Sequence, residues 1–227
     1  MKLSCKDGVK AGFPVMLGYF PVAMAFGILS KGNGFNFMET LSFSFILYAG
    51  ASQFIGVSML ALGAGMGEVV LATLLLNFRH FFMSASLVEK LHHVPNPLKP
   101  ILGFFVTDEV FSVASFSEGE LTSSYLLTLE LVSYLSWVTG TCLGFVMGNF
   151  FPEVLQISMG IGLYALFVSI IVPEIKKNQK AVVLTLMAGL INTIFRWGLH
   201  FPQGWSVVLT IVVVSTLGVV IYRKEAS

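Results

Sequence analysis

Residues 40–67 read TLSFSFILYAGASQFIGVSMLALGAGMG, an uninterrupted run between Glu39 and Glu68 that contains no charged side chain. A helix needs about 20 predominantly apolar residues to cross the hydrocarbon core of a bilayer, and this run exceeds that length. Further charge-free runs of comparable length cover residues 11–30, 131–152, 154–173 and 197–222. The sequence therefore predicts an all-α fold, a polytopic bundle of transmembrane helices.

The composition of the whole chain agrees with this fold class. Of its 227 residues, 56% are hydrophobic and 11% are charged, whereas a soluble domain carries roughly 25% charged residues. This excludes a soluble globule, a disordered chain and a fibrous protein. The net charge of +1 provides no field that would attract nucleic acid. We expect residues 1–227 to form a single integral membrane domain.

The charged positions divide the chain into eight predicted spans. They lie near residues 11–30, 40–63, 68–88, 99–117, 122–148, 154–173, 181–198 and 204–222. With eight spans, the side that holds both termini carries eight Lys and Arg residues and the other side carries four. The positive-inside rule then predicts cytoplasmic termini. If the third or the fourth span is re-entrant, seven spans remain and the orientation reverses downstream.

The third and fourth spans differ from the others because each has an ionisable pair at its midpoint. Arg79 and His80 interrupt the third span, and Asp108 and Glu109 interrupt the fourth. A lone charge at the centre of a membrane helix costs about 2.5–3.5 kcal/mol on translocon scales, so such residues persist mainly when they are paired or functional. Consecutive spans are antiparallel, which places the two midpoints at the same depth. We predict that the two pairs meet there.

Three interpretations of these pairs stay open: they line a polar cavity, they form static salt bridges, or they lie in water at the ends of short half-helices. Asn77 and Thr107 precede the charged residues, and their side chains bond readily to backbone. We therefore expect broken helices near residues 77–80 and 107–109. Irregular backbone at this depth must line a cavity or be buried in protein, so the polar cavity is the favoured interpretation.

A third polar element lies at the middle of the run quoted first, in the sequence AGASQF of residues 49–54. The small residues Gly50, Ala51 and Ser52 allow close approach of another backbone or local unwinding. The amide of Gln53 must find partners in an apolar surrounding. Gln53 is therefore predicted either to line the cavity or to join helices.

These residues suit a zwitterionic amino acid with an apolar side chain. Arg79 offers a planar fork for a carboxylate, and Asp108 or Glu109 can face an ammonium group. The apolar pocket is expected from Phe78, Phe81, Phe82 and Met83. The predicted substrate-binding residues are Arg79, Gln53, Asn77, Asp108, Glu109 and Ser52.

The same region contains groups that can carry a proton in exchange for substrate. His80 has a reference pKa of ~6.5, which lies within reach of physiological pH. A desolvated carboxyl group can also hold a proton, so Asp108 and Glu109 are candidates as well. The alternative is that His80 only donates a hydrogen bond to a neighbouring carbonyl.

The fifth span carries a repeated G-x-x-x-G pattern at Gly140, Gly144 and Gly148, which is typical of a close helix contact. The facing helix can belong to this chain or to a partner, and we predict that a partner subunit docks on this ridge. Glu130, in the same span, is buried or lies at its end, depending on where the helix begins.

The sequence contains no pattern that indicates an enzyme. It has no G-x-x-x-x-G-K-[ST] phosphate loop, no H-E-x-x-H and no G-x-S-x-G. Cys5 and Cys142 lie too far apart in the sequence for a disulfide framework or a metal-binding spacing. We expect no catalytic residues, no cofactor and no metal site.

Three segments resemble the AzlC family: AGASQF at residues 49–54, NFRHFFMS at residues 77–84 and TDE at residues 107–109. The GYFP of residues 18–21 is similar as well. The resemblance implies the large subunit of a two-component bacterial exporter in the inner membrane, with about seven spans. It also implies export of leucine, isoleucine, valine and often methionine, driven by the proton gradient, and a small membrane subunit similar to AzlD. The alternative is a permease subunit or scaffold for another small solute, or one that transports nothing itself.

Overall fold

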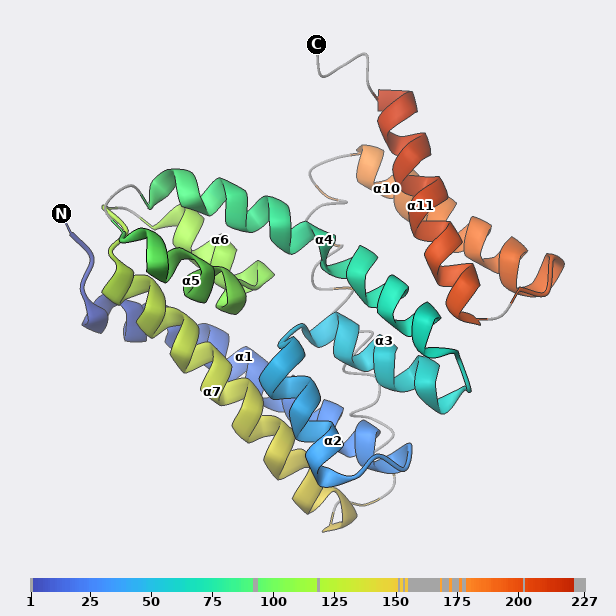
Figure 1. The fold of residues 1–227 in the computed structure, drawn as a ribbon, viewed down its shortest axis with the longest axis horizontal. Helices are drawn as coiled ribbons and strands as arrows, with labels where there is room; N and C mark the ends of the chain where they lie inside the picture. Colours follow the sequence, from blue (N-terminus) through green and yellow to red (C-terminus); the bar gives the residue numbers. More distant parts are fainter. Residues whose placement is uncertain are drawn as a thin grey trace. The chain divides into compact units, whose positions relative to one another are not determined.

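The computed structural model describes residues 2–91, 94–117, 119–150, 179–201 and 203–222, together with Pro152, Val154, Val168, Val172 and Lys176. The elements in chain order are α1 (Cys5–Gly32), α2 (Phe37–Ser42), the π-helix η1 (Phe43–Leu47), α3 (Gly50–Ala61), α4 (Met66–Lys90), the 3₁₀ turn η2 (Asn96–Leu98), α5 (Lys99–Phe105), α6 (Asp108–Phe116), α7 (Ser123–Met147), the 3₁₀ turn η3 (Gly148–Phe150), α10 (Gln179–Thr193), the π-helix η4 (Ile194–Gly198) and α11 (Gln203–Tyr222) (Figure 1). Within the described ranges, α1, α4 and α7 contain segments long and apolar enough to cross a membrane. The predicted helical membrane bundle is confirmed.

The named helices fall within seven of the eight predicted spans. Single helices form the first, third, fifth and eighth spans, namely α1, α4, α7 and α11. The second span is divided into α2, η1 and α3, the fourth into α5 and α6, and the seventh into α10 and η4. The sixth predicted span, 154–173, lies outside the described residues apart from Val154, Val168 and Val172.

Polar caps explain where several helices begin. The Ser4 hydroxyl accepts from the Asp7 amide, and the Asp7 carboxylate accepts in return from the Ser4 amide at 2.8 Å, which starts α1. Asn36 and Glu39 form the same reciprocal pair at the start of α2. Such capping boxes satisfy amides that have no partner inside the helix.

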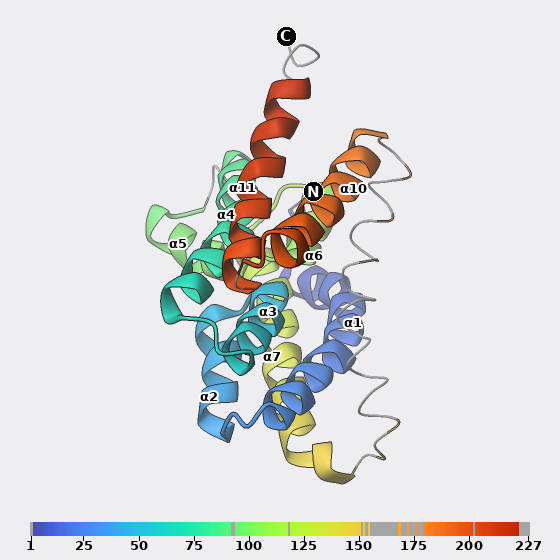
Figure 2. The same ribbon diagram turned by 90° about the vertical axis from the view of Figure 1, so that its right-hand side faces the viewer.

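Contacts divide the chain into two compact units. One contains residues 1–54 and 77–163, and the other contains residues 55–76 and 164–227. In the second unit α10 packs on α11 (Figures 1 and 2), where Leu184 lies against Gly218. A single domain over the whole chain stays a prediction.

The first unit is organised around the close packing of α1 and α7 (Figure 1). Gly8 of α1 lies against the Tyr125 carbonyl near the start of α7, and Gly148 lies against Ile28 at the other end. The contacts thus advance in the same direction along both helices, so α1 and α7 run parallel. Two membrane helices are parallel only if the chain between them crosses the membrane an odd number of times. The three spans predicted between α1 and α7 meet this condition. If just one of those spans were re-entrant, two crossings would remain and the condition would not be met.

The glycine ridge of α7 faces α1 of the same chain. A Cβ atom at Gly140 would lie 2.7 Å from the Phe20 carbonyl oxygen, and one at Gly144 would overlap the backbone of Met24. The prediction that a partner docks on this ridge is therefore wrong. The close helix contact itself is confirmed, but the pattern of small residues specifies only that some backbone approaches closely.

The two expected helix breaks had different outcomes. The break near 107–109 is confirmed, because α5 ends at Phe105 and α6 begins at Asp108. The break near 77–80 is wrong, since α4 continues without interruption from Met66 to Lys90. Asn77 does not turn back to its own backbone. Its side chain instead accepts a hydrogen bond from Ser52, which leaves the helical ladder intact.

Candidate functional site

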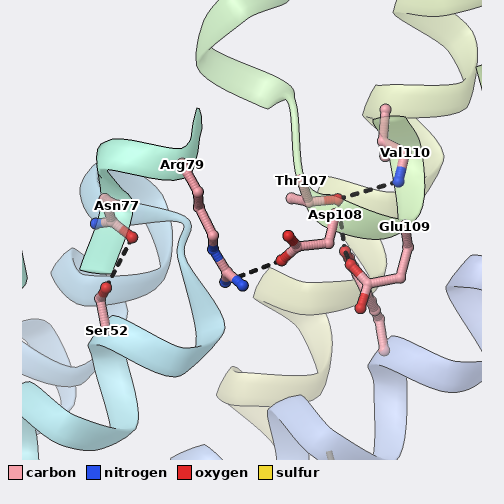
Figure 3. A network of polar contacts seen from close by, with 8 residues as sticks. Ser52, Asn77, Arg79, Thr107, Asp108, Glu109 and Val110 are labelled. Atoms are coloured by element: carbon pink, nitrogen blue, oxygen red, sulfur yellow. Dashed lines mark hydrogen bonds and ion pairs between the residues drawn. The ribbon is translucent and has the colours of Figure 1, made fainter. Parts of the chain in front are cut away.

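The centre of the site is an ion pair between α4 and the start of α6. Arg79 Nη2 lies 2.9 Å from Asp108 Oδ2, and Figure 3 shows the Arg79 side chain pointing toward that carboxylate. This confirms that the basic and acidic midpoints meet. The Arg79 side chain is 39% exposed and that of Asp108 is 30% exposed. The buried Nε of Arg79 has no hydrogen-bond partner among the described residues, so the guanidinium keeps a donor for a further acceptor.

The break between α5 and α6 places the two carboxylates. Thr107 has an extended backbone and caps α6, and its Oγ1 accepts from the Val110 amide at 3.3 Å (Figure 3). Asp108 and Glu109 therefore occupy the first turn, where the partial positive charge of a helix N-terminus favours anionic side chains. The T-D-E sequence produces both the break and the orientation of its acids.

Tyr19 of α1 joins the second carboxylate to this network. Its hydroxyl lies 2.6 Å from Thr107 Oγ1 and also hydrogen-bonds to Glu109 Oε2. A phenol can donate only one hydrogen bond. If the Tyr19 hydroxyl donates to Glu109, the Thr107 hydroxyl must therefore donate to the Tyr19 oxygen. Tyr19 is 7% exposed, and it holds Glu109 at a fixed place beside the ion pair.

Ser52 and Asn77 form a second contact, on the other side of Arg79 in Figure 3. The Ser52 hydroxyl, in the first turn of α3, donates to Asn77 Oδ1 on α4 at 2.8 Å. Both residues were predicted to bind substrate, and the structure brings them together with Arg79 at the same end of the network. Their binding role stays a prediction.

Gln53 has a different environment from these residues. It is fully buried, its Nε2 donates to Ser44 of η1 at 3.0 Å, and its Oε1 accepts from the indole of Trp137 at 2.8 Å. The Ser44 hydroxyl is in turn 2.8 Å from that of Thr141 on α7. These bonds tie three helical segments together, which matches the helix-joining alternative for Gln53. No finding tests whether Gln53 also contacts substrate.

The second predicted span breaks at Tyr48, directly before α3. Tyr48 has φ 40° and ψ 45°, the left-handed conformation, which is a genuine outlier for a bulky residue. Its neighbour Gly50 lies against Trp137, whose ring would be 2.7 Å from an added Cβ. The Tyr48 ring packs edge-on against Tyr134 of α7 at 4.8 Å, and its buried hydroxyl has no partner in the described ranges.

The remaining predicted groups lie on α4 beside Arg79. His80 is half-buried, and the described residues offer its ring no hydrogen bond. Phe78 stacks on Phe81, and Phe82 packs edge-on against both rings, but these side chains are 55%, 65% and 61% exposed in chain order. These three rings therefore do not enclose an apolar pocket, because the helix turns them away from the buried side of α4.

Sequence reasoning missed Tyr19, Tyr48 and Trp137 as members of the site. Each is an amphipathic aromatic residue in an apolar span, which is a common pattern with no specific signal. The neighbours of Tyr19 and Tyr48 offered the only hint, since GYFP and AGASQF combine aromatic residues with helix-weakening ones.

The arrangement suits binding rather than metal chemistry. A half-exposed guanidinium lies next to two carboxylates, so groups of both signs are available within one network. Among the residues that the structure describes, no three His, Cys, Asp or Glu side chains cluster closely enough to hold a metal ion.

Residues 14–151, which include every residue of this network, match the protein family described as AzlC protein. The chain belongs to the AzlC family. This AzlC-family chain is a multi-pass membrane protein, and the relatives named below are membrane proteins.

The chain is similar to the inner membrane protein YgaZ of Escherichia coli, with 31% identity over 81% of the chain and 78% of the relative. An uncharacterized membrane protein of Archaeoglobus fulgidus is 33% identical over 75% of the chain and 76% of the relative. The branched-chain amino acid transport protein AzlC of Bacillus subtilis is 25% identical over 74% of the chain and 66% of the relative. No solved structure matches this AzlC-family chain.

Proposed function

We propose that this protein is a secondary transporter that exports the branched-chain amino acids leucine, isoleucine and valine, and also methionine. The observation that carries the proposal is the half-exposed Arg79–Asp108 pair with Glu109 beside it. The substrate class follows the name of the Bacillus subtilis relative, a branched-chain amino acid transport protein. Transport is the proposed activity.

Binding would proceed by exchange of ionic partners. The substrate carboxylate binds the guanidinium of Arg79, whose Nε has no hydrogen-bond partner among the described residues. Asp108 then binds the substrate ammonium group. Tyr19 holds Glu109 nearby. Removing one member of an ion pair without replacement leaves the other charge without a partner, at a cost that rises with burial. A zwitterion replaces both members at once, whereas a simple anion or a simple cation leaves one of them unpaired.

The broken helices support this location for the substrate. Secondary transporters commonly bind substrate where discontinuous helices expose unpaired backbone groups. Here the second span breaks at Tyr48 and the fourth between Phe105 and Asp108. Ser52 and Asn77, which flank Arg79, and Gln53 behind them complete the proposed set of substrate-binding residues.

Energy coupling, partner and placement extend the same proposal. The proton gradient drives export, and His80, Asp108 and Glu109 are the candidate proton carriers within the network described above. A small membrane subunit similar to AzlD completes the exporter, and the protein lies in a bacterial inner membrane with cytoplasmic termini. The resemblance of the sequence motifs supports the first two points, and the distribution of Lys and Arg supports the orientation.

Counterflow of radiolabelled leucine into liposomes tests the proposal. The wild-type protein, purified with the small subunit if the two copurify, should accumulate label against unlabelled leucine, and an imposed pH gradient should drive net movement. Arg79→Ala should reduce counterflow to the level of empty liposomes. Arg196→Ala is the matched control, because that arginine is exposed and, among the described residues, bonds only the nearby Phe201 carbonyl at 3.2 Å.

Three outcomes would contradict parts of the proposal. Counterflow at a normal rate in a folded Arg79→Ala variant would show that the ion pair only links the helices and does not bind substrate. Wild-type counterflow of another solute, and not of leucine, would overturn the substrate class. Transport that ignores the pH gradient would overturn proton coupling.

A further inference from the structure

Glu130, near the middle of α7, is a charged residue type in a place that the proposed substrate site does not use. Its side chain is fully buried. Neither of its carboxyl oxygens has a hydrogen-bond partner among the residues that the structure describes. Buried side-chain oxygens nearly always find a partner, so a carboxyl group with two unpartnered oxygens requires a specific explanation.

The described groups around Glu130 cannot neutralise a negative charge. Glu130 forms no hydrogen bond or ion pair with any residue that the structure describes. The titratable side chains near it in the described ranges are tyrosines. Tyr134 lies one turn further along α7 with its hydroxyl already donating to the Phe45 carbonyl, and the ring of Tyr48, from the break before α3, packs against that of Tyr134. Tyr19 of α1 is engaged with Glu109 and Thr107.

A carboxylate in such a place is strongly disfavoured, because an isolated charge in an apolar medium neutralises itself by taking up a proton. The Glu130 carboxyl group is therefore neutral in this conformation. Releasing the proton requires a second conformation in which water or a cation reaches the group. A group that is forced to be neutral in one conformation and free to ionise in another binds a proton in step with the conformational change.

Tyr48 links this carboxyl group to the substrate site. Its hydroxyl has no hydrogen-bond partner in the described ranges. Its ring packs against Tyr134, one turn beyond Glu130, and against Phe105, the last residue of α5 before the break that places the two acids. Tyr48 also stands in the left-handed conformation at the break of the second span, and strained backbone of this kind recurs in switch regions. A rotation at this break moves one hydroxyl relative to both carboxyl groups.

We propose that Glu130 is the proton-binding site that couples this protein to the proton gradient. The carboxyl group holds the proton in the conformation described here, and its O–H bond breaks in the alternative conformation, with the proton passing to water on the other side of the membrane. This inference rests on the proposed function, but it places the coupling site on α7 rather than at His80, Asp108 or Glu109.

Glu130→Gln separates coupling from substrate binding. Glutamine has the shape of the protonated acid and cannot release a proton, so leucine counterflow, which needs no net proton movement, should stay within about twofold of wild type, whereas export driven by a pH gradient should fall by about tenfold or more. Glu130→Asp should restore part of the driven export. Glu39→Gln is the matched control, because Glu39 is an exposed capping residue.

Infrared spectroscopy of the purified protein gives a readout that does not depend on transport. Wild type at neutral pH should show a carboxylic-acid C=O band that disappears in Glu130→Gln and shifts in Glu130→Asp. If Glu130→Gln does not fold, the shift in Glu130→Asp still identifies the band.

The proposal and the function on which it rests fail in different ways. If the wild-type protein shows no leucine counterflow, the substrate is wrong, and the infrared band still tests Glu130. If wild type shows both counterflow and driven export, undiminished driven export in Glu130→Gln overturns the proposal. Absence of a protonated carboxyl band that belongs to Glu130 overturns it as well.

Discussion

Replacement of Gly144 by alanine tests the packing on which the first unit depends. The added methyl group would overlap the carbonyl oxygen, Cα and carbonyl carbon of Met24, all of which are backbone atoms of α1. Backbone atoms cannot swing aside as a flexible side chain does. The two helices must therefore separate, by at least about 0.8 Å to bring the 2.6 Å contact with Met24 Cα to the ordinary 3.4 Å limit.

The cost can be bounded from that separation. A gap of about 0.5–1 Å already forfeits a quarter to a half of each dispersion contact along the interface. Overpacking of a tight contact typically costs about 1–3 kcal/mol, and the rigid neighbours place Gly144→Ala toward the upper end. For a chain of this length, about 2–3 kcal/mol lowers the unfolding midpoint by roughly 4–12 °C.

The assay is the amount of monodisperse protein that survives heating in detergent, measured by size-exclusion chromatography. Gly18→Ala on α1 is the matched control, because an added Cβ there meets no atom within 4 Å, and its midpoint should equal or exceed that of wild type. Equal midpoints for Gly144→Ala and Gly18→Ala would refute the α1–α7 contact. Folded Gly144→Ala should still copurify with a small subunit, since α1 already covers the ridge.

Three further predictions concern the polar network. Arg79→Ala and Asp108→Ala should each lower the yield of folded protein, because each leaves one charge unpaired. The double variant should regain yield without regaining leucine counterflow. Transport by the double variant would show that the pair is only structural. Tyr19→Phe removes the donor to Glu109 and should slow counterflow with little change in the unfolding midpoint, whereas unchanged kinetics would contradict a positioning role. Gln53→Leu removes the acceptor of the buried Trp137 indole N–H, whereas Ser44 keeps its bond to Thr141, so we expect a loss of about 1–3 kcal/mol for the one unpaired group, and an unaltered midpoint would contradict this.

Short-range signals predicted some parts of the site well. The T-D-E sequence combines a capping residue with two acids, and it produced the expected helix start with both acids in its first turn. The position of Arg79 at the midpoint of a span, opposite that of Asp108, predicted their contact, since a charge in an apolar span needs a partner. Asn77 misled for the opposite reason, because a tertiary partner, Ser52, satisfied its side chain.

The sequence by itself determined that the chain is a helical membrane protein, where its spans lie, which two of them carry ionisable pairs, and that α7 meets another helix closely at its glycines. These properties depend on neighbours along the chain. Only the tertiary structure decided that α1 faces the glycine ridge, that Tyr19 bonds Glu109, and that Glu130 is buried without a partner. Hydropathy and spacing along the sequence indicate that a residue needs a partner, whereas the packing of distant segments decides which partner it contacts.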